Sequence, residues 1–199
     1  MPIHNKDIAE VFGQVADLLE IKGDNPFRIR SYRNAARTVG SLSKDVSDLV
    51  AQEKDLTTYP GIGKDLAGKI EQVVTTGKLD LLDELREQMP AALTDLMKVS
   101  GLGPKRVATI YHKLDISQPD ELRAAAEAGR IRTLRGFGRK TEQNILEGAK
   151  RLAEEHTLRL KLVEAEQFAE PLIDYLQNVN GVKGVVAAGS YRRRKETVG

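Results

Sequence analysis

Three Gly-x-Gly sequences, each followed by basic residues, are the part of this chain best suited to binding phosphate. The glycine pairs are Gly61 with Gly63, Gly101 with Gly103, and Gly136 with Gly138. One glycine of a pair can take a positive φ to close a turn, and the other lets a partner approach the backbone. The basic residues that follow are Lys64, Lys105, Arg106, Arg139 and Lys140. A helix beginning at such a turn would offer unpaired amides and a positive dipole to a phosphate.

Apolar residues recur around each glycine pair at the same offsets. They lie five and two residues before the first glycine, and one and nine residues after it. The three sets are Leu56, Tyr59, Ile62 and Ile70; Leu96, Val99, Leu102 and Ile110; and Ile131, Leu134, Phe137 and Ile145. This repeat predicts a short helix, a tight turn and a second helix in each copy. None of these groups reads a base edge, so we expect contacts to a nucleic-acid backbone without sequence readout.

The spacing resembles the helix-hairpin-helix motif of DNA-binding and repair proteins. The resemblance implies that each hairpin grips the phosphodiester backbone and that loop carbonyls hold a monovalent cation, Na⁺ or K⁺. The implied carbonyls belong to Thr57, Tyr59, Ile62, Met97, Val99 and Leu102. A dinucleotide-binding loop is disfavoured, because Leu66, Arg106 and Thr141 stand where its third glycine would be. Glycines that only cap helices are a further alternative, but three copies in phase favour the hairpin.

Composition narrows the function classes. The 199 residues contain 31 Lys and Arg against 29 acids, a formal charge of +2, so nucleic-acid binding would depend on local patches. The absence of cysteine excludes disulfides and thiolate metal sites. The N-terminal residues lack a signal-peptide apolar stretch, and no apolar run reaches membrane length. We therefore expect a cytoplasmic monomer with no membrane partner.

The elements expected to position the hairpins are helices. A first helix is predicted from Asn5, with Asn5 as its cap, and Gly23 to Pro26 ends it and starts a second. Four arginines of that second helix form either a DNA-binding patch or an ordinary solvated face: Arg28, Arg30, Arg33 and Arg37. Residues 1–88, 89–156 and 157–199 are predicted as three domains. After a further helix near 164–177, residues 182–188 are predicted as a strand.

The strand opens into Gly189-Ser190-Tyr-Arg-Arg193, followed later by Gly199. The hydroxyl of Ser190 and the planar fork of Arg193 would suit a triphosphate, and the glycines would permit close backbone approach. Together with the hairpins, this segment makes the chain resemble the N-terminal portion of a family X DNA polymerase of the bacterial type.

The resemblance implies a mainly α chain. It would consist of a lyase-like and a fingers-like helical domain with tandem helix-hairpin-helix motifs, followed by the start of an α+β nucleotidyltransferase palm. Its partner would be gapped or nicked DNA. The implied dNTP-binding residues are Gly189, Ser190, Arg193, Gly199 and, less directly, Arg159. The aspartates that hold Mg²⁺ or Mn²⁺ are expected beyond Gly199, so this chain alone should not polymerise.

A second chemistry is implied at the first hairpin. In some family members a lysine attacks the C1′ aldehyde of a 5′-deoxyribose phosphate, forms a Schiff base and eliminates the sugar phosphate. Lys69 occupies that position, and Tyr32 falls in a segment that lines the family's pocket. Nearby cations such as Arg28 or Lys64 would favour the neutral amine that attack requires. The chain departs from the family pattern at Phe27, Asp65 and Gly68, where the family has a histidine, a lysine and a glutamate.

Two functions remain open at this point. One is a gap-filling DNA repair polymerase, which this chain represents without its catalytic acids. The other is a non-enzymatic helix-hairpin-helix clamp of another repair protein. The Gly-Ser-x-Arg-Arg segment after a strand discriminates between them, because a clamp does not need it.

Overall fold

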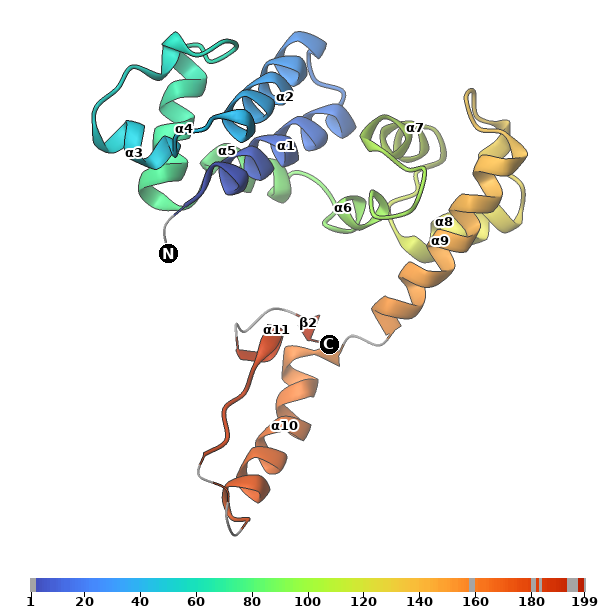
Figure 1. Ribbon diagram of the computed structural model, residues 1–199. Helices are drawn as coiled ribbons and strands as arrows, with labels where there is room; N and C mark the ends of the chain where they lie inside the picture. Colours follow the sequence, from blue (N-terminus) through green and yellow to red (C-terminus); the bar gives the residue numbers. More distant parts are fainter. Residues whose placement is uncertain (1–2, 158–159, 180–181, 183, 193–196, 199) are drawn as a thin grey trace. The chain divides into compact units, whose positions relative to one another are not determined.

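The computed structural model describes residues 3–157, 160–179, 182, 184–192 and 197–198 (Figure 1). The chain divides into two compact units, Met1–Ala149 and Lys150–Gly199. The described residues are mainly α-helical, as predicted. Among them, no helix is both long enough and apolar enough to cross a membrane.

The first half of the first unit is a helical cluster around a single core. It contains α1 (Asn5–Lys22), α2 (Pro26–Ser41), α3 (Val46–Ala51), the 3₁₀ helix η1 (Leu56–Thr58), α4 (Lys64–Thr76) and α5 (Asp80–Glu87). α1 and α2 lie side by side (Figure 1). The rings of Phe12 and Tyr32 meet between them, with centroids 5.6 Å apart. This core gives hairpin 1, residues 56–70, a rigid support.

The N-cap of α1 lies one residue before the predicted cap. His4, in extended backbone, is the N-cap of α1, and its amide donates to Asp7 at 2.9 Å. The Asn5 side chain instead donates to the carbonyls of Leu42 and Lys44 and accepts from the Val46 amide at 2.8 Å. Asn5 therefore secures the connection between α2 and α3, and its predicted capping role in α1 is wrong. The partners are about 40 residues away, so local sequence could not indicate them.

The second half of the first unit carries the other two hairpins. It contains α6 (Ala92–Leu96), α7 (Pro104–Leu114), α8 (Pro119–Glu127), the 3₁₀ helix η2 (Ile131–Thr133) and the start of α9 (Arg139–Thr157). α7 also packs against α1. The His112 imidazole Nε2 lies 2.7 Å from the Ile21 carbonyl at this contact.

The apolar repeat occupies equivalent buried places in all three copies. Every residue five before, one after and nine after the first glycine is at most 6% exposed. Those two before it are buried or half-buried. The repeat therefore predicted three copies of one unit: short helix, turn, second helix. Its physical basis is that a helix pair can bury only the residues on its facing sides.

The second unit contains the end of α9, α10 (Leu162–Gln177), the four-residue α11 (Gly189–Arg192) and two short strands. β1 (Leu160–Lys161) and β2 (Thr197–Val198) pair antiparallel, with Leu160 opposite Val198. The strand predicted over 182–188 is wrong for the described residues of that range, which form no ladder. A strand requires neighbours to satisfy its backbone and cover its side chains, and Val186 is 80% exposed.

Candidate nucleic-acid interface

The first glycine of each pair is the one that closes the turn. Gly61, Gly101 and Gly136 have φ values of +79°, +85° and +88°. A residue with a Cβ would be strained in this left-handed region. Each turn is closed by a backbone hydrogen bond across the glycine, such as that from the Ile62 amide to the Tyr59 carbonyl at 3.2 Å. The three hairpins therefore share one backbone design.

The second glycine of each pair does a different task. Gly63 and Gly103 are the N-caps of α4 and α7, with φ of −87° and −84°. A Cβ built on Gly63, Gly103 or Gly138 would meet nothing within 4 Å. Such a φ suits any residue, and the fold leaves the space beside each glycine open. That open space lies at the unpaired amides of a helix N-terminus, where an anion binds.

Basic side chains accompany these helix starts. Lys64, Lys105, Arg139 and Lys140 are all exposed. The dipole at each helix N-terminus and these charges act in the same direction on an anion. The structure therefore brings together, at each hairpin, the predicted glycines, the amides and at least one basic residue.

Arg106 departs from that pattern. Its Nη1 donates to the Gly101 carbonyl at 2.8 Å, and its guanidinium lies 5.6 Å from the centre of the Phe137 ring. Phe137 is the apolar residue between the glycines of hairpin 3, residues 131–145. Arg106 therefore braces hairpin 2, residues 96–110, and links it to hairpin 3. Its place after the glycine pair predicts a DNA-contacting basic residue, and nothing in the local sequence indicates this internal role.

Hairpin 1 is held by groups on both sides of the turn. The Thr38 hydroxyl of α2 donates to the Pro60 carbonyl at 2.9 Å. At the other end, the Asp55 carboxylate accepts from the Thr57 hydroxyl at 2.7 Å and from the Thr57 amide at 2.8 Å. These hydrogen bonds from Thr57, the hydroxyl first, lower the pKa of Asp55 below its ordinary 3.8. The turn is therefore anchored to α2 and capped at η1.

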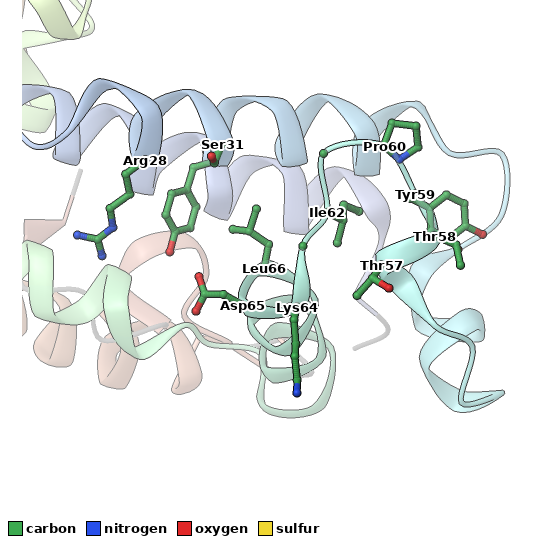
Figure 2. Close-up of a pocket in the computed structure, with 13 residues that line it drawn as sticks. Arg28, Ser31, Thr57, Thr58, Tyr59, Pro60, Ile62, Lys64, Asp65 and Leu66 are labelled. Atoms are coloured by element: carbon green, nitrogen blue, oxygen red, sulfur yellow. The ribbon is translucent and has the colours of Figure 1, made fainter.

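A surface depression of about 690 Å³ lies between hairpin 1 and α2. Figure 2 shows Arg28 and Ser31 of α2 together with Lys64, Asp65 and Leu66 from the start of α4. Tyr32 also lines it, and the Tyr32 hydroxyl is buried with no hydrogen-bond partner among the described residues. A buried hydroxyl without a partner is costly, so it marks a place where a ligand group could bind.

Burial and nearby charged side chains both affect the pKa of the Tyr32 hydroxyl. Burial raises the pKa of Tyr32 above its ordinary value; the charge of Lys69 opposes the shift and that of Asp65 adds to it. Tyr32 therefore keeps its proton through the neutral range and can donate a hydrogen bond. The resemblance indicated that the segment containing Tyr32 lines a pocket, but the sequence did not indicate that Tyr32 lies between α1 and α4.

Lys69 lies one turn after Asp65 on α4, and its Nζ forms an ion pair with the Asp65 carboxylate. The Lys69 side chain is only 22% exposed, whereas that of Asp65 is 77% exposed and lines the depression. Lys69 is thus paired with a carboxylate of its own helix, while the expected cations Arg28 and Lys64 line the depression. The ion pair between Asp65 and Lys69 was not predicted from the sequence, although their i, i+4 spacing could have indicated it.

The arginines of α2 are engaged to different degrees. Arg33 pairs with Glu20 at 2.8 Å and Asp17 at 3.5 Å, which ties α2 to α1. Arg28 pairs with Asp24 at 2.9 Å. Arg30 and Arg37 are exposed. Arg33 is therefore a structural residue as well as a wall of a second depression, about 610 Å³, at hairpin 2.

Most of the predicted nucleotide-binding residues fall outside the part of the chain that the structure describes. Arg159, Arg193, Gly199 and the Ser190 side chain are outside the described residues. Gly189 is exposed, with φ of +63°, and starts α11. Among the described residues, no group of three or more His, Asp or Glu side chains could hold a metal ion.

Two family models match the chain. Residues 3–79 match the family described as helix-hairpin-helix domain, and residues 93–151 match the family described as SAM-like helix-hairpin-helix tandem. The first match contains hairpin 1, and the second contains hairpins 2 and 3. The three repeats recognised by their spacing thus lie within the two helix-hairpin-helix matches.

Individual relatives match along nearly the whole chain. The DNA polymerase/3′-5′ exonuclease PolX of Bacillus subtilis (strain 168) is 31% identical over 196 residues, which are 98% of this chain and 34% of that protein. DNA polymerase lambda of Arabidopsis thaliana is 29% identical over 205 residues, covering 100% of this chain and 34% of that protein. DNA polymerase lambda of Rattus norvegicus is 24% identical over 196 residues. The chain thus spans about a third of the length of the curated relatives it matches.

Three in-phase hairpins, the helix starts that follow them, and these matches agree with one another. Residues 3–79 and 93–151 therefore match helix-hairpin-helix families, and the chain is similar, over nearly its whole length, to an N-terminal portion of the family X DNA polymerases.

Proposed function

We propose that this chain is the DNA-gripping part of a gap-filling DNA repair polymerase. The observation that carries the proposal is the threefold hairpin, with its open second glycine, helix N-terminus and exposed basic residue. The relatives named as DNA polymerases support the polymerase part of the proposal. Its substrate would be gapped or nicked DNA, held through phosphates in the cytoplasm by a monomeric protein.

The polymerase site itself is proposed from the resemblance alone. Ser190, Arg193, Gly189, Gly199 and Arg159 would contribute to the dNTP site. Among the described residues, no group of three or more His, Asp or Glu side chains could hold Mg²⁺ or Mn²⁺. A monovalent cation at the hairpins would bind the backbone carbonyls of Thr57, Tyr59, Ile62, Met97, Val99 and Leu102.

DNA binding provides the test. We expect similar affinity for gapped duplexes of unrelated sequence, and a steep loss of affinity as salt rises, because phosphate contacts release counterions. Replacing Lys64 with alanine should lower the affinity for every sequence and reduce the salt slope by about 1. Replacing Lys78, an exposed lysine away from the hairpin turns, should change neither. Strong preference for one sequence, or no dependence on salt, would refute the backbone-grip proposal.

A second activity is favoured by the depression beside hairpin 1. We propose that Lys69 is the Schiff-base nucleophile of a 5′-deoxyribose phosphate lyase and that Tyr32 donates a hydrogen bond to the sugar. The support is the buried Tyr32 hydroxyl and the Lys69 side chain beside it, which is 22% exposed. Arg28 and Lys64 line the same depression and would attract the phosphates.

Borohydride trapping tests the lyase. With DNA bearing a 5′-deoxyribose phosphate, the chain should give a stable protein–DNA crosslink. Replacing Lys69 with alanine should abolish the crosslink and leave gap binding nearly intact, whereas Lys78→Ala should crosslink normally. Full crosslinking by the Lys69 variant would show that another amine reacts.

A further inference from the structure

The carboxylate of Asp65 occupies a distinctive place in the candidate lyase site. It contacts the Lys69 amine, and it also lines the depression that Arg28 and Tyr32 share. Asp65 and Lys69 are four residues apart on α4, so their side chains project from the same face of the helix. With 77% of its side chain exposed, Asp65 is open to a ligand entering from solvent.

The other groups around the depression cannot accept a proton near neutral pH. Arg28 and Lys64 are cations, and the Tyr32 hydroxyl keeps its proton because burial raises its pKa. Among the described residues that line the depression, Asp65 is the one carboxylate. Glu71, two residues after Lys69, lines a different depression with Asp55.

We propose that Asp65 is the base that removes the C2′ proton during the elimination step of the lyase reaction. This assignment rests on the lyase activity proposed above for Lys69. The family pattern has a lysine at position 65 and a glutamate at position 68, whereas this chain has its carboxylate at position 65 and a glycine at position 68.

The lyase reaction begins at the aldehyde of the 5′-deoxyribose phosphate. Lys69 Nζ adds to the C1′ aldehyde and water leaves, which forms an iminium ion. Asp65 takes the C2′ proton, and the electron pair of that C–H bond forms the C1′=C2′ double bond of an enamine. The enamine then expels the 3′-phosphate oxygen as the C3′–O bond breaks and a C2′=C3′ double bond forms. Water hydrolyses the iminium, which frees Lys69, and Asp65 returns its proton to solvent.

Geometry supports the step because C1′ alone separates C2′ from the lysine nitrogen. A carboxylate that touches Nζ in the free protein is therefore within a small side-chain rotation of the C2′ hydrogen once the iminium has formed. Forming the imine also removes ammonium protons from Nζ, which releases the carboxylate from part of its ion pair.

The test separates imine formation from elimination under single-turnover conditions. Borohydride crosslink yield measures the first, and release of the 5′-phosphorylated strand measures the second. With Asp65→Asn we expect a crosslink yield within about twofold of wild type, and strand release slowed about 100-fold, the usual contribution of a general base. Asp65→Glu should restore part of the rate.

Glu71→Gln is the matched control, since it removes a carboxylate from the same helix outside the depression, and it should leave both readouts unchanged. Release by the Asn variant at the wild-type rate would overturn the proposal. Equal loss of crosslink and release would also overturn it, because Asp65 would then be positioning Lys69. Absence of a crosslink in wild type would instead refute the lyase function itself.

Discussion

Glu142 accepts a hydrogen bond from the backbone amide of Arg132 at 2.9 Å, and its other carboxylate oxygen lies 3.4 Å from the Arg132 Nε. Glu142 belongs to α9 and Arg132 to η2, on opposite sides of the hairpin 3 turn. The residues at the equivalent place in hairpins 1 and 2 are the apolar Ala67 and Val107. Hairpin 3 is thus closed by a buried carboxylate where the other two are closed by apolar packing, and Arg132 is engaged within the protein.

Replacing Glu142 with alanine should destabilise the first unit. The Arg132 amide would lose its partner, and leaving such a group unpaired costs about 1–3 kcal/mol. Thermal or urea unfolding would measure the loss. Glu147→Ala, which removes an exposed glutamate from the same helix, should cost far less. Equal stability of the two variants would contradict the closing role of Glu142.

The two glycines of hairpin 1 should respond differently to alanine. Gly61→Ala should lower stability as well as DNA affinity, because its φ of +79° strains any residue with a Cβ. Gly63→Ala should keep its stability, since its φ of −87° suits alanine and its Cβ meets nothing. It should still weaken DNA binding several-fold, because the methyl group would stand where a phosphate approaches the α4 amides. Unfolding and gapped-DNA titrations check both; normal DNA binding by Gly63→Ala would place the DNA elsewhere.

Gly148 of α9 should not tolerate a side chain. A Cβ there would lie 2.7 Å from the Cγ1 of Val99 in hairpin 2. Val99 is buried and β-branched, so it has little freedom to move. We expect Gly148→Ala to lower stability by about 1–3 kcal/mol through overpacking. Gly13→Ala is the control: its Cβ would meet nothing within 4 Å, and alanine in a helix interior should raise stability by about 0.5–1 kcal/mol.

Alanine variants of Lys105 and Arg106 should distinguish a loss of DNA affinity from a loss of stability at hairpin 2. Lys105→Ala should weaken binding uniformly across DNA sequences and leave stability unchanged, because Lys105 is exposed. Arg106→Ala should lower stability, because the Gly101 carbonyl and the Phe137 ring both lose their partner. Comparing melting temperatures with the salt dependence of DNA affinity tests the distinction. An Arg106 variant as stable as wild type would contradict the bracing role.

Acid should weaken the cap of hairpin 1. Hydrogen bonds from Thr57 lower the pKa of Asp55 below 3.8 in the folded protein, so the unfolded chain takes up a proton first as pH falls. The stabilisation by Asp55 is therefore complete above pH 3.8 and is lost as pH falls through the lower, folded-state pKa. Asp55→Ala should melt below wild type at pH 7, and the gap should narrow towards pH 3. A difference in melting temperature that stays constant with pH would contradict this origin.

Much of the hairpin design could be predicted from the sequence, because its determinants lie within about 15 residues of each other. The offsets of Leu56, Ile62 and Ile70 around Gly61 specify a helix, a turn and a helix through local geometry alone. The turn needs a glycine with positive φ, and that requirement is also local. Repetition of the pattern at Gly101 and Gly136 then made the function class recognisable.

The remaining features join residues that are distant along the chain, and these only the tertiary structure decided. Asn5 accepts a hydrogen bond from the Val46 amide at the start of α3, Gly148 leaves room for the Val99 side chain, and the Arg106 guanidinium lies over the Phe137 ring. Charge and spacing predict the same DNA-contacting role for Lys105 and Arg106, but Arg106 contacts the neighbouring hairpin whereas Lys105 is exposed. Even Lys69 and Asp65, one helical turn apart, acquire a candidate chemistry only because α2 places Tyr32 and Arg28 around them. A side chain's partners depend on which elements pack together, and packing reflects the whole core, of which each local pattern is a small part.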